Sequence, residues 1–157
     1  MHPVVRATSV ISFLQGMTAT ALIPRVPELI NQLGLNFVQW GTLLGTIALA
    51  SLFPLIFTNK LVMQYGTRNV IAVGSVVFAA ANAFIPWCSS AWMFAIVAVT
   101  QTLAASAFNL ALQASAVMLQ KKLKKPVMGK VHGAWSIGAT VSAALSGVLI
   151  PVMDFKL

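Results

Sequence analysis

Amide side chains on one predicted helix are the best candidates for chemistry in this sequence. Within the apolar stretch 91–119, polar residues recur at steps of four, three and four, which places them on one face of a helix. They are Thr102, Ser106, Asn109 and Gln113. An amide is costly to bury in an apolar environment unless it pairs or meets water. Asn109 and Gln113 therefore predict either hydrogen bonds between helices or the wall of a cavity that contacts a solute, and the spacing fits both.

Two further apolar stretches carry polar residues at helical spacing. Stretch 7–23 has Ser9, Ser12, Gly16 and Thr20 on one face, with Gln15 nearby. Stretch 131–153 has His132, Ser136 and Thr140 at steps of four, with Trp135 adjacent. For the single hydroxyls, hydrogen bonding between helices is the favoured interpretation, because such bonds are common in any helical bundle.

The groups that catalysis requires are not found together. The only carboxylates, Glu28 and Asp154, lie outside the apolar stretches, and His132 has no acidic partner within them. No Gly-x-x-x-x-Gly-Lys-[Ser/Thr] loop is present for nucleotide phosphates. The single cysteine, Cys88, excludes an internal disulfide and any site with several cysteine ligands. We expect no enzyme activity, no bound metal and no cofactor.

The elements that position these residues are predicted to span a membrane. Apolar residues make up 59% of the sequence and charged residues only 8%, whereas about a quarter of an ordinary soluble domain is charged. The net charge of +8 does not indicate nucleic-acid binding, because the basic residues lie between apolar runs and not on one basic face. The partner that this composition predicts is the lipid bilayer.

Five uncharged stretches approach the roughly 20 residues that a membrane-spanning helix needs. They are approximately 7–23, 37–58, 69–87, 91–119 and 131–153. Helices are the only structures that satisfy the backbone of such isolated segments in lipid. The expected fold is an all-α, polytopic transmembrane bundle forming one membrane domain over 1–157. Pro54 should kink the second span, and Pro86 should end the third.

Charge asymmetry predicts the orientation of these spans. One side of the membrane receives Arg6, Lys60, Arg68, Lys121, Lys122, Lys124, Lys125 and Lys130, and the other receives Arg25 and Lys156. The positive-inside rule then places the N-terminus in the cytoplasm. Trp40, Trp87 and Trp92 fall at the outer ends, where interfacial tryptophans are expected. His132 falls at the cytoplasmic end of its span, so interface anchoring is favoured over proton transfer. The run Lys121–Lys125 is favoured as a topology anchor over a lipid-binding site.

Paired glycines predict where helices pack closely. Gly41 and Gly45 form one Gly-x-x-x-Gly pair in the second span, and Gly129 and Gly133 form another at the start of the fifth.

The whole pattern resembles the N-terminal half of a major facilitator superfamily (MFS) transporter. The resemblance rests on the topology and on the basic segment 59–68 between spans two and three. It also rests on segments 108–113 and 129–138, which are similar to spans four and five of bacterial members that resemble sugar transporters and of related members. Gly66 and Arg68 match the family's gating loop. Asn59 replaces its first glycine, Met63 its aspartate and Thr67 its first basic residue, so the family's ion pair at the cytoplasmic gate cannot form here.

The resemblance implies a secondary transporter of a small solute, working by alternating access in a bacterial plasma (inner) membrane. Helices one and four would line the cavity, so Gln15, Asn109 and Gln113 are the first candidates for solute contact, and His132 and Trp135 are weaker ones. Thr100 stands where proton-coupled exporters carry an arginine. Five spans supply one helix triplet and two helices of the next, so we expect a fragment lacking the sixth helix, with a missing C-terminal half as partner. The alternative is a truncated or partner-dependent membrane interaction subunit with no transport of its own.

Overall fold

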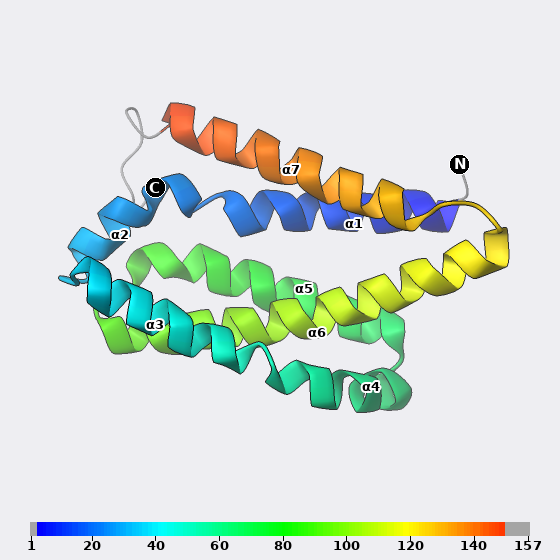
Figure 1. The fold of residues 1–157 in the computed structure, drawn as a ribbon, viewed down its shortest axis with the longest axis horizontal. Helices are drawn as coiled ribbons and strands as arrows, with labels where there is room; N and C mark the ends of the chain where they lie inside the picture. Colours follow the sequence, from blue (N-terminus) through cyan, green and yellow to red (C-terminus); the bar gives the residue numbers. More distant parts are fainter. Residues whose placement is uncertain (1–2, 150–157) are drawn as a thin grey trace. The chain divides into compact units, whose positions relative to one another are not determined.

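The computed structural model describes residues 3–149, and every regular element in that range is helical (Figure 1). The helices are α1 (Pro3–Thr20), α2 (Val26–Gln32), α3 (Phe37–Ala50), α4 (Phe53–Tyr65), α5 (Thr67–Phe84), α6 (Ala91–Leu123) and α7 (Met128–Leu149). Single 3₁₀ turns, Ile23–Arg25 and Ile85–Trp87, follow α1 and α5. The expectation of an all-α fold is confirmed.

Within residues 3–149, four helical segments are long and apolar enough to cross a membrane. They are Pro3–Gln32, Phe37–Tyr65, Thr67–Trp87 and Ala91–Leu123. Each contains one of the first four predicted spans. The fifth predicted span, 131–153, begins within α7, which is not among these segments. Its last residues lie outside the described part of the chain, so a fifth crossing stays a prediction.

The second predicted span is two helices. α3 ends at Ala50, and α4 begins at Phe53 with Pro54 in its first turn. Proline lacks an N–H and fits the first turn of a helix but not its interior. The turn at Ser51 and Leu52 is therefore how the chain accommodates Pro54, where a kink was expected.

Other boundaries also differ from the expected ones. α4 continues to Tyr65, so most of the expected loop 59–68 is helical and the connection to α5 narrows to Gly66. α6 extends past the expected end at 119 to Leu123, because lysine and leucine are good helix formers. The outer connection after α1 is not an open loop, since α2 forms within it.

The chain divides into two compact units. The first contains residues up to Arg25 together with those from Leu112 onward, and the second contains Val26–Ala111. The last part of α6 therefore belongs to the first unit, and its longer beginning belongs to the second.

In the first unit, α1 and α7 run parallel in close contact. Thr20 Oγ1 lies 2.9 Å from the Ala139 carbonyl oxygen, and Ser146 Oγ donates to the Ala21 carbonyl at 2.6 Å. Val5, near the start of α1, shares an apolar cluster with Val131. Because positions rise together along the two helices, their N-terminal ends lie on the same side of this unit.

Glycines on different helices, and not the predicted pairs, mark the closest approaches. A Cβ added to Gly16 would collide with the Trp135 carbonyl oxygen, and one added to Gly138 would collide with the Phe13 carbonyl oxygen. Gly41, Gly45, Gly129 and Gly133 have nothing within 4 Å of such a Cβ. The two Gly-x-x-x-Gly pairs therefore do not form helix contacts among the described residues. That prediction was wrong because spacing within one helix does not say which face meets a neighbour.

In the second unit, aromatic contacts join α3 and α5 to α6. Trp40 packs on Phe94 with ring centroids 5.1 Å apart, and Phe78 lies 6.4 Å from Phe108. Trp40 is consequently buried, unlike the exposed Trp87 and Trp92 that were expected to resemble it.

Candidate functional site

The polar face of α6 is as predicted from its spacing. Thr102, Ser106, Asn109 and Gln113 all lie within the uninterrupted helix. Thr102, Ser106 and Asn109 are half-buried, and Gln113 is exposed. Asn109 and Gln113 are separated by about 6 Å along the helix axis. Each amide can donate and accept hydrogen bonds, so the pair can recognise a polar solute from a rigid helix.

Gln15 has a more enclosed environment. It lies on α1 in the first unit and is 7% exposed. Its neighbour Ser12 is 2% exposed, and among the described residues its hydroxyl has no hydrogen-bond partner. Gln15 and Ser12 are thus buried, and at Thr20 the polar face of α1 forms a direct hydrogen bond to α7. Thr20 therefore has the helix-to-helix role expected for the hydroxyls, whereas among the described residues Ser9 and Ser12 do not.

The candidate residues of α7 lie differently from those of α1. His132 is exposed, and Trp135 is half-buried with its carbonyl against Gly16. The hydroxyls that follow are bonded along their own helix: Ser136 Oγ donates to the His132 carbonyl at 3.1 Å, and Thr140 Oγ1 donates to the Ser136 carbonyl at 2.9 Å. The series His132, Ser136 and Thr140 therefore forms an exposed stripe on α7.

The structure groups these candidates by unit. Gln15, Gln113, His132 and Trp135 belong to the first unit, and the Trp135 carbonyl lies against Gly16, the residue after Gln15. Asn109 belongs to the second unit, although it shares α6 with Gln113.

The expected gating segment is a tight turn between α4 and α5. Gly66 has φ +78° and ψ 149°, a backbone conformation open to glycine and strained for other residues. Its N–H donates to the Val62 carbonyl at 2.9 Å, and Asn69 Nδ2 donates to the Tyr65 carbonyl at 2.9 Å. Arg68 is exposed beside this turn. The match at Gly66 therefore has a conformational reason.

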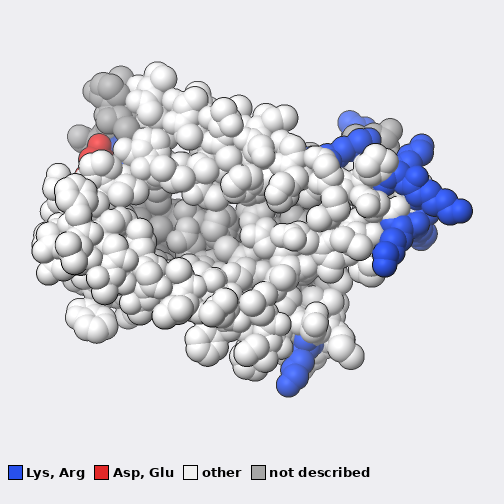
Figure 2. Space-filling view, in the orientation of Figure 1, with Lys and Arg blue, Asp and Glu red and all other residues white. Residues whose placement is uncertain are grey.

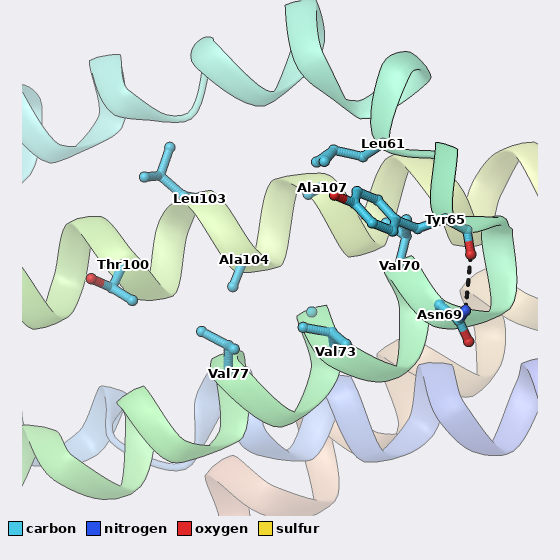
Figure 3. Close-up of a pocket in the computed structure, with 11 residues that line it drawn as sticks. Leu61, Tyr65, Asn69, Val70, Val73, Val77, Thr100, Leu103, Ala104 and Ala107 are labelled. Atoms are coloured by element: carbon cyan, nitrogen blue, oxygen red, sulfur yellow. Dashed lines mark hydrogen bonds between the residues drawn. The ribbon is translucent and has the colours of Figure 1, made fainter. Parts of the chain in front are cut away.

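An apolar groove in the second unit was not anticipated. It has a volume of about 690 Å³ between α4, α5 and α6 (Figure 3). Its lining consists of Leu61, Tyr65, Asn69, Val70, Val73, Gly74, Val77, Thr100, Leu103, Ala104 and Ala107. The only sequence signal was the helical spacing of valines on α5, which a lipid-facing surface shares. Three helices had to be placed together before the groove could be recognised.

These features define a polytopic helical membrane protein whose polar side chains are carried on long apolar helices. The family model of the Major Facilitator Superfamily matches residues 8–156, so the chain belongs to that superfamily. The chain is also similar to an uncharacterized MFS-type transporter from Yersinia pestis, with 26% identity over 137 residues. That alignment covers 87% of this chain and 36% of the relative, so the chain spans about a third of the relative's length. No solved structure matches it.

Proposed function

We propose that this chain is part of the N-terminal half of a secondary transporter that moves a small solute across the membrane by alternating access. The observation that carries the proposal is the superfamily match over residues 8–156 of a chain with four segments able to cross a membrane. The similar Yersinia pestis protein, described as an MFS-type transporter, supports it. Because this chain aligns with only 36% of that protein, the proposed transport unit includes further helices that complete the cavity.

Asn109 and Gln113 are the proposed primary solute contacts. Amides in an apolar helix are stabilised only by a partner or by water, and their incomplete burial in the described chain leaves them accessible to a solute. Gln15 on α1 is a further proposed contact. Because Gln15 is only 7% exposed, α1 has to move before this side chain can meet the solute. His132 and Trp135 are proposed as weaker contributors on α7.

The proposed orientation has the N-terminus in the cytoplasm of a bacterial cell, with the chain in the plasma membrane. Figure 2 shows basic side chains gathered at the connection between α6 and α7, and a further one apart from them at the lower edge of the view. Arg6 and Lys130 lie near the N-terminal ends of the parallel helices α1 and α7. A shared basic end in this unit supports the positive-inside assignment.

Coupling to protons is not proposed to occur through this chain. Glu28 is the one carboxylate in the described range, and it lies in α2 between the long apolar helices. Thr100 provides no charge where coupled exporters carry arginine. Facilitated diffusion, exchange, or coupling through the remaining helices is therefore the proposed mode.

Uptake into vesicles tests the proposal. The full-length transporter would be reconstituted and offered a panel of labelled sugars, amino acids and nucleosides. For the solute that is taken up, Asn109→Ala and Gln113→Ala should each raise KM about tenfold, the effect of losing one buried hydrogen bond of about 1.5 kcal/mol. Gln101→Ala, which removes an amide from another face of α6, is the matched control.

Two outcomes would decide against parts of the proposal. Unchanged KM in both variants would remove Asn109 and Gln113 from the cavity wall. Failure to transport any solute, combined with stable assembly onto another membrane protein, would favour the interaction subunit that does not transport.

A further inference from the structure

The groove between α4, α5 and α6 has walls suited to a hydrocarbon chain. Figure 3 shows Val73 and Val77 of α5 reaching toward Ala104 of α6, with Leu61 of α4 across the same space. Its volume of about 690 Å³ lies in the range of about 300–1,000 Å³ that is typical of ligand pockets. From Asn69 to Val77 it extends about 12 Å along the axis of α5.

Of the three polar side chains that line the groove, Tyr65, Asn69 and Thr100, two already donate a hydrogen bond within their own helix or turn. Thr100 Oγ1 donates to the Ile96 carbonyl at 2.8 Å, and Asn69 Nδ2 donates to the Tyr65 carbonyl at 2.9 Å. Few donors are left to orient a polar solute in the middle of the groove, so an apolar occupant fits it better.

Two basic residues directly precede lining residues of the groove in the sequence. Lys60 precedes the lining residue Leu61, and Arg68 precedes the lining residue Asn69; both basic residues are exposed. α4, α5 and α6 contain no carboxylate, so these helices offer the two cations no acidic partner. Basic groups at the predicted cytoplasmic side attract anionic lipid headgroups.

We propose that this groove binds an anionic phospholipid, with one acyl chain between Val73, Val77 and Leu103 and its phosphate held near Lys60 and Arg68. The apolar walls account for the acyl chain, and Lys60 within α4 and Arg68 at the start of α5 select the charge of the headgroup. The proposal rests on membrane residence, on this groove and on the predicted cytoplasmic position of Lys60 and Arg68, so it stands whether or not the chain transports a solute.

Photolabelling of the reconstituted chain tests the acyl-chain site. The probe is phosphatidylglycerol with a diazirine midway along one acyl chain, in phosphatidylcholine vesicles. Labels should map to the groove residues of α5 and α6. Val73→Phe should lower this labelling severalfold by filling the groove, whereas Val76→Phe should leave it unchanged. These two valines lie on one helix and are 63% and 67% exposed, but only Val73 lines the groove.

Charge variants test the headgroup site independently of packing. Lys60→Gln with Arg68→Gln should lower phosphatidylglycerol labelling by about fivefold for each basic residue removed. The matched pair Lys121→Gln and Lys122→Gln removes the same charge at the end of α6 and should leave it unchanged. Phosphatidylcholine carrying the same diazirine should label the groove weakly in every variant.

Three results would overturn the proposal. One is equal labelling by the two lipids, which would make the groove an unselective lipid contact. Another is undiminished labelling in Val73→Phe and in the Lys60/Arg68 double variant. The third is cross-linking of groove residues to a second copy of the chain in place of lipid.

Discussion

Gly16 on α1 and Gly138 on α7 each face the backbone of the other helix. The space where a side chain of Gly16 would lie is occupied by the Trp135 carbonyl, and that of Gly138 by the Phe13 carbonyl. Such closeness lets Thr20 reach the Ala139 carbonyl and Ser146 reach the Ala21 carbonyl. Without water in the surroundings, van der Waals contact and hydrogen bonds of this kind are what hold membrane helices together.

Adding a methyl group at this interface should destabilise the first unit. Gly16→Ala and Gly138→Ala each force α1 and α7 apart, at a cost of about 1–3 kcal/mol for overpacking. Gly133→Ala is the control on α7, because nothing lies within 4 Å of its Cβ; it should be neutral or slightly stabilising, since alanine favours a helix. The measurement is the free energy of unfolding in mixed micelles titrated with denaturing detergent. Equal effects at Gly133 and Gly138 would contradict the close contact.

The sequence could predict the helices far better than their contacts. Apolar length located all four described candidate spans, and Pro54 located the interruption of the second. The glycine pairs at Gly41 and Gly129 failed as contact predictions, because the real contact pairs positions about 120 residues apart. Periodicity describes one helix at a time, and two helices packed together obey no spacing rule in the sequence.

The candidate site shows the same division. Spacing correctly placed Asn109 and Gln113 on one face of α6, since both depend only on a continuous helix. Spacing could not predict that Gln15 would be buried or Gln113 exposed, because burial is set by the neighbouring elements. The groove beside Val73 could not be predicted from the sequence, because its walls come from three different helices.

Gly66 should be intolerant of substitution because of its backbone and not its surroundings. Its φ of +78° with ψ of 149° is a conformation that costs a residue with a side chain about 1–3 kcal/mol. Gly66→Ala should therefore lower the free energy of unfolding by that amount although no atom lies within 4 Å of the added Cβ. Gly41→Ala, which has equally open space and no positive φ, serves as the control. A loss of stability in both variants, or in neither, would show that conformation at Gly66 is not the cause.

Gln120 should stabilise the start of α7. Its Oε1 accepts hydrogen bonds from the N–H groups of Val127 at 3.0 Å and Met128 at 3.2 Å, which lie at the beginning of a helix that leaves such groups unpaired. Gln120→Met keeps the length of the side chain but removes the acceptor, and should cost about 1–2 kcal/mol, as loss of a helix cap does. Hydrogen exchange at these two amides should accelerate.

A rescue distinguishes capping by Gln120 from simple packing. Gln120→Glu keeps an oxygen acceptor and places negative charge at a helix N-terminus, where it is favourable. It should restore slow exchange at Val127 and Met128. If the Val127 and Met128 amides exchange as fast in Gln120→Glu as in Gln120→Met, the hydrogen bonds from these amides to residue 120 do not stabilise the start of α7.

Cys88 should react slowly with thiol reagents, for two separate reasons. It is 0% exposed, and its Sγ lies 3.8 Å from the Phe84 carbonyl. Burial also raises the pKa of the Cys88 thiol, and the thiolate is the reactive form. A raised pKa means less thiolate at a given pH, so the rate of N-ethylmaleimide modification should rise over a higher pH range than it does for an ordinary thiol. Cys88 is the chain's one cysteine, so the whole signal reports on it. Ser89→Cys in a Cys88→Ala background places the thiol at an exposed neighbour and should react fast, with the pH profile of an ordinary thiol.

Gln32 should protect Cys88 from thiol reagents. Its Nε2 donates to the Pro86 carbonyl at 2.9 Å and to the Cys88 carbonyl at 2.7 Å, and these bonds tie α2 to the turn that contains Cys88. Gln32→Ala should therefore speed modification of Cys88 severalfold, and an unchanged rate would show that Gln32 does not hold the turn closed.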